Sequence, residues 1–291
     1  MKTIKLLILT IVLSLNTIFA QKSGVNVDTK NTEISYLELP RIQVIPIKDT
    51  KNKRQYELYI KLPEGYSKDN DTKYPVIYFT DAMWHVEILS GSAEYIIQEA
   101  ILVGISWQKD LNSDSVYTSR FRDYSITKSS NPEHQAKYQF GGANDHLAFI
   151  QNDVIPYVEN NYHTDPDNRS YFGYSMGRKF GAYILFTQPD TFKNYILGSP
   201  SVSSNKPYIH ELESIKNLNR KNLNANIFVS VGALERKDAV GQAIGLASIL
   251  RSENYTTLSS KLEVIESADH SKAFPMTAVL GMYWLSDFIK K

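Results

Sequence analysis

The sequence predicts an α/β fold: a mostly parallel central sheet with antiparallel strands at its N-terminal edge and helices on both faces. Two segments near the start of the chain, 33–47 and 55–62, alternate between apolar and polar residues, a pattern typical of half-exposed edge strands. Beyond them, short apolar runs that suit buried strands alternate with longer segments that suit helices. Repeated alternation of this kind favours parallel strands joined by helices that cover both faces of the sheet.

The first buried strand is expected at 74–80, where a continuous apolar run ends at Thr80. A long helix is expected over 141–162, although Pro156 inside it should kink the helix or remove one of its hydrogen bonds. Residues 107–140 show no clear pattern and are expected to form a long loop, which in a compact domain usually has a function or hides a missed element. The other expected strands are 100–105, 169–174, 194–197, 226–231 and 261–266, and the other expected helices are 87–99, 176–186, 207–216, 239–251 and 274–289.

The N-terminus has the organisation of a secretory signal peptide. Lys2 and Lys5 precede an apolar run over 6–15, and the small residue Ala20 stands where a cleavage site is expected. The apolar run is too short to span a bilayer, so a membrane anchor is the weaker interpretation. We therefore expect the mature protein to be exported, either to the periplasm or out of the cell. The expected organisation is a signal peptide over 1–20, a polar N-terminal segment over 21–32 and a single α/β domain over 33–291.

Composition and charge exclude several kinds of protein. The chain contains no cysteine, which rules out a lipid-anchored lipoprotein, disulfide bonds and thiolate metal sites. Removing the predicted signal peptide takes two lysines from 32 basic residues and leaves 30 against 31 acidic residues, a formal charge of −1 that argues against nucleic acid as a ligand. The histidines show no metal-binding spacing such as H-E-x-x-H. We therefore expect no metal and no cofactor, and a small molecule as the binding partner.

Residues 173–177, Gly-Tyr-Ser-Met-Gly, fit the pattern of a nucleophile elbow. In this turn a strand passes sharply into a helix with the serine in a strained conformation, and glycine on either side avoids collisions with the neighbouring backbone. The context agrees, because 169–174 suits a strand and 176–186 suits a helix. Ser175 is therefore the candidate nucleophile, although so short a motif also occurs by chance.

A serine hydroxyl needs a base to remove its proton and an acid to orient that base. In a sheet of this kind these groups follow later strands in the order Ser, then Asp or Glu, then His. Downstream of Ser175 the histidines are His210, in an expected surface helix, and His270, directly after the last expected strand. The acid should follow the preceding expected strand, where Glu235 and Asp238 are the candidates. Glu235 is preferred because it lies nearer the strand end, whereas Asp238 also suits the start of a helix.

The negative charge that develops on the substrate oxygen needs two backbone N–H donors. The N–H of Met176, at the start of the helix after the elbow, is the first candidate. The second donor should come from the loop after the strand 74–80, which contains residues 81–84. The side chains of Met83 and Trp84 in this loop are equally suited to filling the core.

Several segments match one known family. Asp81 follows its strand as in the Asp-Gly pair of that family, although Ala82 replaces the glycine. Further matches are Val-Gly-Ile at 103–105, Arg-Asp-Tyr at 122–124, Gly-Gly-Ala at 141–143, Ile-Pro-Tyr-Val at 155–158, Tyr-His-Thr-Asp at 162–165, Gly-Ala-Leu-Glu at 232–235 and Asp-His-Ser at 269–271. Over roughly residues 40–290 the sequence resembles the putative-esterase family of α/β hydrolases, which includes enterobactin-type siderophore esterases, esterase D and the mycolyltransferases.

The resemblance implies the α/β-hydrolase fold and a set of site residues. Ser175, Glu235 and His270 would form a catalytic triad. The N–H groups of Met83 and Met176 would form the oxyanion hole. The implied activity is that of a serine esterase that hydrolyses a carboxylic ester through an acyl-enzyme.

The sequence departs from the family directly after the elbow. The family usually places a small residue after Gly177, whereas this chain has Arg178 followed by Lys179. A cation in the first turn of a helix is unfavourable against the helix dipole, so Arg178 should either extend to solvent or reach into the site. This departure leaves open a relative that binds a ligand without catalysis. An acyltransferase that uses the same triad is the other alternative.

The substrate is expected to carry an aromatic or anionic acyl group. The segment 107–140 is rich in aromatic residues and arginines and is expected to cap the pocket, although a surface loop with scattered arginines is the alternative. Trp84, Arg122 and Tyr174 are the candidate substrate-binding residues. A catecholate siderophore ester and a feruloylated or acetylated sugar are the candidate substrates.

Overall fold

The computed structural model describes residues 41–68, 71–111, 116–200, 223–252 and 258–289. All of them belong to one unit of the chain, Pro40–Lys291. The predicted signal peptide, the polar segment 21–32 and the predicted helix 207–216 with His210 lie outside the described residues. Within the described ranges, no helix has the length and hydropathy that crossing a membrane requires.

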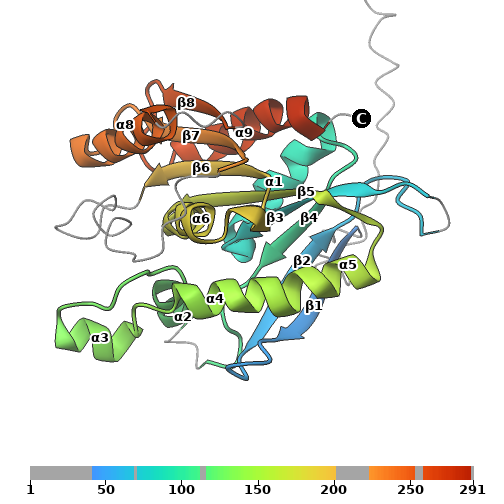
Figure 1. The fold of residues 1–291 in the computed structure, drawn as a ribbon, viewed down its shortest axis with the longest axis horizontal. Coiled ribbons are helices and arrows are strands. Elements are labelled where there is room, and N and C mark those ends of the chain that lie inside the picture. Colours follow the sequence, from blue (N-terminus) through green and yellow to red (C-terminus); the bar gives the residue numbers. More distant parts are fainter. Residues whose placement is uncertain (1–40, 69–70, 112–115, 201–222, 253–257, 290–291) are drawn as a thin grey trace, which may run out of the picture. The chain divides into compact units, whose positions relative to one another are not determined.

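The described strands form one sheet (Figure 1): β1 (Ile42–Lys48), β2 (Gln55–Lys61), β3 (Tyr74–Thr80), β4 (Ile101–Ile105), β5 (Thr164–Ser175), β6 (Asn194–Pro200), β7 (Asn226–Gly232) and β8 (Ser259–Ile265). Their order across the sheet is β1-β2-β4-β3-β5-β6-β7-β8. β1 pairs with β2, and β2 with β4, in antiparallel register, whereas the remaining neighbours pair in parallel. The prediction of a mostly parallel sheet with antiparallel strands at its N-terminal edge is confirmed.

Helices cover both faces of this sheet, as predicted (Figure 1). α1 (Ala82–Ile96) and α9 (Ala273–Ile289) share a core with one face. The core on the other face includes residues of α4 (Ala143–Phe149), the π-helix η2 (Ile150–Val154), α5 (Ile155–Asn161), α6 (Met176–Thr187) and α8 (Lys237–Ser252). The shorter helical elements are α2 (Val116–Asp123), α3 (Pro132–Tyr138) and η3 (Pro189–Thr191).

The central strands are buried on both faces because helices cover both. In β5, Tyr171 packs into the core that includes α6, and Phe172 packs into the core that includes α1 and α9. β3 is buried along its whole length, which explains its continuous apolar run. Fully burying a large apolar side chain stabilises the fold by about 1.5–3 kcal/mol. The strands that lead to the candidate site are therefore held from both sides.

The prediction of a long loop over 107–140 was wrong, because this segment contains α2 and α3. Over 118–123, the part of α2 whose burial is described, the buried residues are polar or charged, among them Arg120, Arg122 and Asp123, so apolar periodicity does not reveal this helix. α3 has no buried residue and shows no such periodicity either. A local signal was nevertheless present, since a proline stands in the first turn of α3 and the side chain of Asn131 caps it.

The helix predicted over 141–162 is present, but its winding changes before Pro156. α4 passes into the π-helix η2 and then into α5, whose first turn contains Pro156. A proline inside a helix lacks an N–H, and its ring clashes with the carbonyl group four residues earlier. A π-helical segment widens the helix at such a point. The irregularity predicted around Pro156 is therefore the π-helical segment η2, just before the proline.

Candidate active site

Ser175 stands at the turn between β5 and α6. Its backbone has φ 57° and ψ −114°, a strained conformation for a residue with a side chain. A Cβ atom on Gly173 would lie 2.4 Å from the carbonyl oxygen of Gly177, and one on Gly177 would lie 2.3 Å from Oγ1 of Thr80. Both positions therefore require glycine, and the turn has the geometry of a nucleophile elbow.

The structure brings Ser175, His270 and Glu235 together. Ser175 ends β5, Glu235 lies between β7 and α8, and His270 lies between β8 and α9. Nε2 of His270 lies 3.1 Å from Oγ of Ser175, and Nδ1 of His270 lies 2.8 Å from Oε2 of Glu235. When Nδ1 donates its proton to Glu235, Nε2 is free to accept the hydroxyl proton of Ser175. A serine, an imidazole and a carboxylate in this order can activate the serine as a nucleophile.

The Glu235 carboxylate is nearly buried, with 3% of its side chain exposed, and protein donors surround it. Its Oε1 accepts hydrogen bonds from the N–H of Gly232 at 2.9 Å and from Oγ of Ser199 at 2.5 Å. Burial acts to raise the pKa of Glu235, but the hydrogen bonds from His270, Ser199 and Gly232 outweigh it and hold the pKa below its ordinary value. Glu235 is therefore a carboxylate at neutral pH, and its negative charge lies against the ring of His270.

The turns that carry Glu235 and His270 are bonded to each other. The N–H of Ala233 donates to the carbonyl oxygen of Ile265, and the N–H of Leu234 donates to that of Ala268, both at 2.9 Å. A Cβ atom on Gly232 would lie 2.3 Å from the carbonyl oxygen of Ala268, so only glycine fits at this contact. The candidate acid and base are therefore positioned as a pair.

Two other carboxylates near this group have local roles. Asp238 lies in the first turn of α8 and pairs with Arg236 at 2.7 Å. Asp269 accepts hydrogen bonds from two N–H groups of its own turn. Of the two candidate acids, Glu235 is therefore the one bonded to His270.

Met176 and Met83, the candidate oxyanion donors, both lie in the first turn of a helix. Met176 is the first residue of α6, and Met83 is the second residue of α1. The N–H groups of a first turn have no acceptor within their own helix and lie at the positive end of its dipole. These are the properties that binding of an oxyanion requires.

The buried side chain of Asp81 holds the loop before α1. Asp81 has φ 58° and is fully buried. Its carboxylate accepts a hydrogen bond from Nε1 of Trp107 at 2.7 Å and two from Arg120, at 2.8 and 3.1 Å. Its N–H donates to the hydroxyl of Tyr124 at 3.3 Å. Together these bonds fix the backbone that leads into Met83.

Trp84 is the candidate substrate-binding residue whose side chain is exposed. Its exposed fraction is 48%, and it directly follows Met83 in α1. Its ring packs edge to face on Trp107, with 4.5 Å between the centroids, and the guanidinium of Arg120 lies 5.2 Å from its centroid. Trp84 therefore offers a supported aromatic surface next to a candidate oxyanion donor.

Arg122 and Tyr174 are directed into the protein instead. Arg122 is 6% exposed and donates hydrogen bonds to Asp123 and Gln108, each at 2.8 Å. Tyr174 is 5% exposed, and its hydroxyl donates to the carbonyl oxygen of His270 at 2.5 Å. Neither side chain is placed to contact a substrate, which differs from the prediction for both. The reason is that Arg122 is bonded to buried residues, and the hydroxyl of Tyr174 is bonded to the main chain of His270.

Arg178 was expected to reach either solvent or the site, and it does not reach solvent. Its side chain is 1% exposed, and one guanidinium nitrogen lies 3.5 Å from the carbonyl oxygen of Gln242 in α8. Lys179 is buried as well. α6 is covered along nearly its whole length, so a long side chain in its first turn extends beneath the neighbouring helix. Arg178, the residue that suggested a relative without catalysis, therefore extends towards α8.

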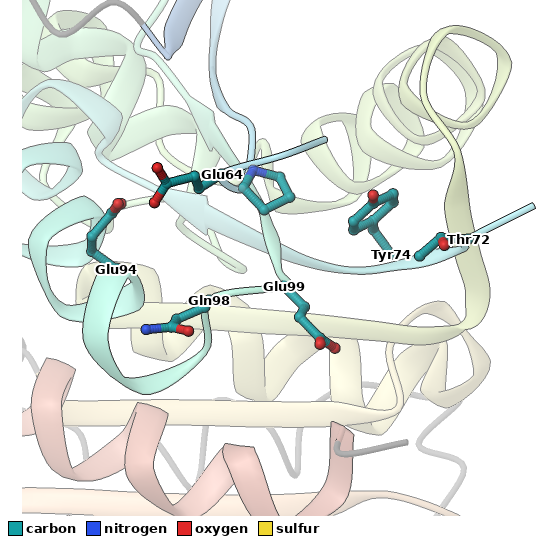
Figure 2. A pocket seen from close by; sticks show the side chains of 7 residues that line it. Glu64, Thr72, Tyr74, Glu94, Gln98 and Glu99 are labelled. Carbon is teal, nitrogen blue, oxygen red and sulfur yellow. The ribbon is translucent and has the colours of Figure 1, made fainter. Parts of the chain in front are cut away.

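A cavity of about 600 Å³ lies near the C-terminal end of α1, where Glu94 lines it. Figure 2 shows its lining side chains. Glu64, Glu94 and Glu99 are among its lining residues. Glu94 is partly neutralised by Lys61, whose Nζ lies 2.8 Å from its carboxylate. α1 has 15 residues and is therefore roughly 20 Å long, so this acidic cavity is separate from the candidate active site.

The order of the strands, the strained serine and its hydrogen-bonded histidine and glutamate define a serine hydrolase with the α/β-hydrolase fold. The model of the family described as "Putative esterase" matches residues 50–275. The chain therefore belongs to this family, and it is a hydrolase that acts on esters. The predicted family and fold are both confirmed.

Individual relatives and solved structures agree with this assignment. The chain is 29% identical over 213 residues to the ferri-bacillibactin esterase BesA of Bacillus subtilis (strain 168), a match that covers 68% of this chain and 72% of that protein. The crystal structure of the BES protein from Bacillus cereus aligns with a TM-score of 0.74 at 26% identity, over 88% of this chain and 98% of that one. An IroE-like serine hydrolase from Shewanella oneidensis has the same fold, with a TM-score of 0.69 at 21% identity over 86% of this chain and 82% of that one.

Proposed function

We propose that this chain is a serine esterase in which Ser175 attacks the ester carbonyl, His270 is the general base and Glu235 orients that base. The observation that carries the proposal is the continuous series of hydrogen bonds from Oγ of Ser175, through the ring of His270, to the buried carboxylate of Glu235. Membership of an esterase family supports the class of reaction.

The first step of the proposed reaction forms an acyl-enzyme. Nε2 of His270 takes the hydroxyl proton as Oγ of Ser175 attacks the carbonyl carbon, and Glu235 stabilises the charged ring. The N–H groups of Met176 and Met83 donate hydrogen bonds to the oxyanion of the tetrahedral intermediate. His270 then gives its proton to the leaving alcohol, and the bond between the acyl carbon and the alkoxy oxygen breaks.

The second step releases the acid. A water molecule gives a proton to Nε2 of His270 and attacks the acyl carbon, which passes through a second oxyanion held by the same two N–H groups. When this intermediate collapses, the proton returns to Oγ of Ser175 and the carboxylic acid leaves. Glu235 remains ionised throughout, because its hydrogen bonds favour the charged form.

The proposed substrate class is a catecholate siderophore ester. One relative is named as an esterase of ferri-bacillibactin and another, from Aspergillus fumigatus, as an esterase of the siderophore triacetylfusarinine C. In this chain the exposed ring of Trp84 stands next to Met83, with the cation of Arg120 against it. A flat catechol ring can stack on such a surface, and so can a feruloyl group, whereas an acetyl group has no ring to stack.

The test uses residues 21–291, the chain without the predicted signal peptide. Initial rates are measured with a ferric catecholate trilactone, a feruloyl sugar ester and an acetyl sugar ester, with and without an acceptor sugar. The trilactone is expected to be hydrolysed fastest. Ser175→Ala is expected to abolish both turnover and labelling by a fluorophosphonate, whereas Ser260→Ala, a matched change on β8, should retain both.

Three outcomes would contradict the proposal in different ways. Full activity in Ser175→Ala would refute the choice of nucleophile. Equally slow rates on all three esters would refute the substrate class. Ester product formed on the acceptor sugar would identify the acyltransferase alternative.

A further inference from the structure

We propose that Tyr174 is a positioning residue that holds the main chain of His270 in place for its contact with Ser175. The inference rests on the proposed function, because it concerns the orientation of the general base. Tyr174 directly precedes the nucleophile in β5, and its side chain lies in the core shared with α1 and α9. It therefore supports the site from inside the protein.

The ring of Tyr174 is fixed by close packing. Its centroid lies 5.2 Å from that of Phe274 and 5.3 Å from that of His270. A Cβ atom on Gly198 would lie 2.6 Å from Cδ2 of Tyr174, so the ring lies directly against the backbone of β6. A ring packed in this way has little freedom to move. Its hydroxyl is therefore held at a constant position.

This hydroxyl donates to the carbonyl oxygen of His270 at 2.5 Å. Because the bond is to the main chain, both ring nitrogens of His270 are left to Ser175 and Glu235. The turn that carries His270 contains Ser267 in the left-handed region, with φ 58°. Tyr174 thus joins this turn to the strand that ends in the nucleophile.

The 3.1 Å separation between Nε2 of His270 and Oγ of Ser175 is accordingly supported by Tyr174 as well as by Glu235 and its turn. Glu235 acts through the ring of His270, and Tyr174 acts through its main chain. Without the hydroxyl the carbonyl oxygen of His270 loses this donor, and the turn can shift. A displacement of about 1 Å costs about 10² in rate in well-aligned active sites. Since Tyr174 is only 5% exposed, substrate affinity should not change.

The test is Tyr174→Phe, which removes the hydroxyl and keeps the ring. We expect kcat to fall by about tenfold or more, KM to stay within about twofold, and fluorophosphonate labelling of Ser175 to slow by the same factor as kcat. The matched control is Tyr78→Phe in β3. Tyr78 is fully buried in the core on the opposite face, and its hydroxyl has no hydrogen-bond partner among the described residues. Its kcat should equal that of the wild type.

A second measurement does not depend on turnover. The proton on Nδ1 of His270, in its hydrogen bond to Glu235, should give a low-field NMR signal in the wild type and in Tyr78→Phe. In Tyr174→Phe this signal should broaden or disappear. If the wild type hydrolysed no ester, the proposed function would fail, but the comparison of NMR signals would still decide the role of Tyr174.

The other outcomes each overturn the inference. A higher KM with unchanged kcat would make Tyr174 a substrate contact. A lower thermal midpoint with unchanged kcat and an unchanged NMR signal would make its hydroxyl purely structural. If Tyr174→Phe and Tyr78→Phe changed kcat equally, the effect on kcat would not depend on the bond between Tyr174 and His270.

Discussion

Replacing Arg120 with methionine would leave the carboxylate of Asp81 in the interior without its cation. Nε and Nη2 of Arg120 both bond to Asp81, and the exposed fractions of the two side chains are 11% and 0%. Removing one partner of a buried pair typically costs about 3–5 kcal/mol, because the remaining charge is uncompensated. Methionine keeps much of the apolar stem, so the loss of the ion pair should dominate the effect.

These energies convert into a large change in the thermal midpoint. In a protein of this size each 1 kcal/mol lowers Tm by about 2–4 °C, so Arg120→Met should lower Tm by about 6–20 °C. The substitution also loosens the loop that leads into Met83. Complete loss of one oxyanion donor costs about 10²–10³ in rate, so a displaced donor should lower kcat by at least about tenfold.

The assays are urea unfolding, thermal unfolding and kcat on a p-nitrophenyl ester. The matched control is Arg236→Met, which removes an exposed pair with Asp238 whose side chains are 71% and 46% exposed. Exposed pairs contribute about 0–1 kcal/mol. The double variant Asp81→Asn with Arg120→Met should be more stable than Arg120→Met, since it removes the stranded charge. A loss of stability in Arg120→Met no larger than in the control would refute the reasoning.

The remaining predictions concern the acid and the elbow. Glu235→Gln should lower kcat by about 10⁴ with little change in KM, because an amide favours the wrong tautomer of His270; a drop below about tenfold in steady-state kinetics would contradict this. The pKa of Glu235 lies below its ordinary value of 4.5, so its contribution to stability is complete above that value and is lost as the pH falls through the lower, folded-state pKa. Urea unfolding from about pH 7 to about pH 3 should therefore show the wild type and Glu235→Gln converging in acid, and a constant gap would count against it. Gly173→Ala places a Cβ atom 2.4 Å from the carbonyl oxygen of Gly177 and should cost about 1–3 kcal/mol or more. Gly241→Ala in α8 has open space around its Cβ atom and should stabilise the fold by about 0.5–1 kcal/mol; equal urea midpoints for the two variants would contradict the clash.

Chain order predicted where the residues that meet at the elbow lie, although it left Glu235 and Asp238 as alternatives for the acid. Parallel strands end at one edge of the sheet, so residues that follow β5, β7 and β8 are brought close together whatever the helices between them contain. Ser175, Glu235 and His270 occupy these three places. The position of a residue relative to a strand end can be read from the hydrophobic pattern, and the known order of serine, acid and histidine in such sheets then selects the candidates.

The directions of individual side chains were not predictable in the same way. Arg178 extends towards Gln242, a partner 64 residues later in the sequence. Tyr174 points to the face covered by α9, and neither motif nor periodicity states which face that helix covers. Ser199 donates to Glu235 from the end of β6, yet it lies in no motif and gave no signal. Such roles depend on partners that are distant in the sequence. α2 was missed because its described buried side chains are charged or polar and give no apolar periodicity.

The bonded turns that carry Glu235 and His270 have a consequence for how relatives of this chain can diverge. Because Ala233 and Leu234 bond to the opposite turn, an insertion in either turn would have to be matched by a compensating change in the other. We therefore expect changes in these two turns to be coupled among relatives. Trp84 lies on a separate helix, so a substitution there should alter ester preference without moving the proposed acid and base.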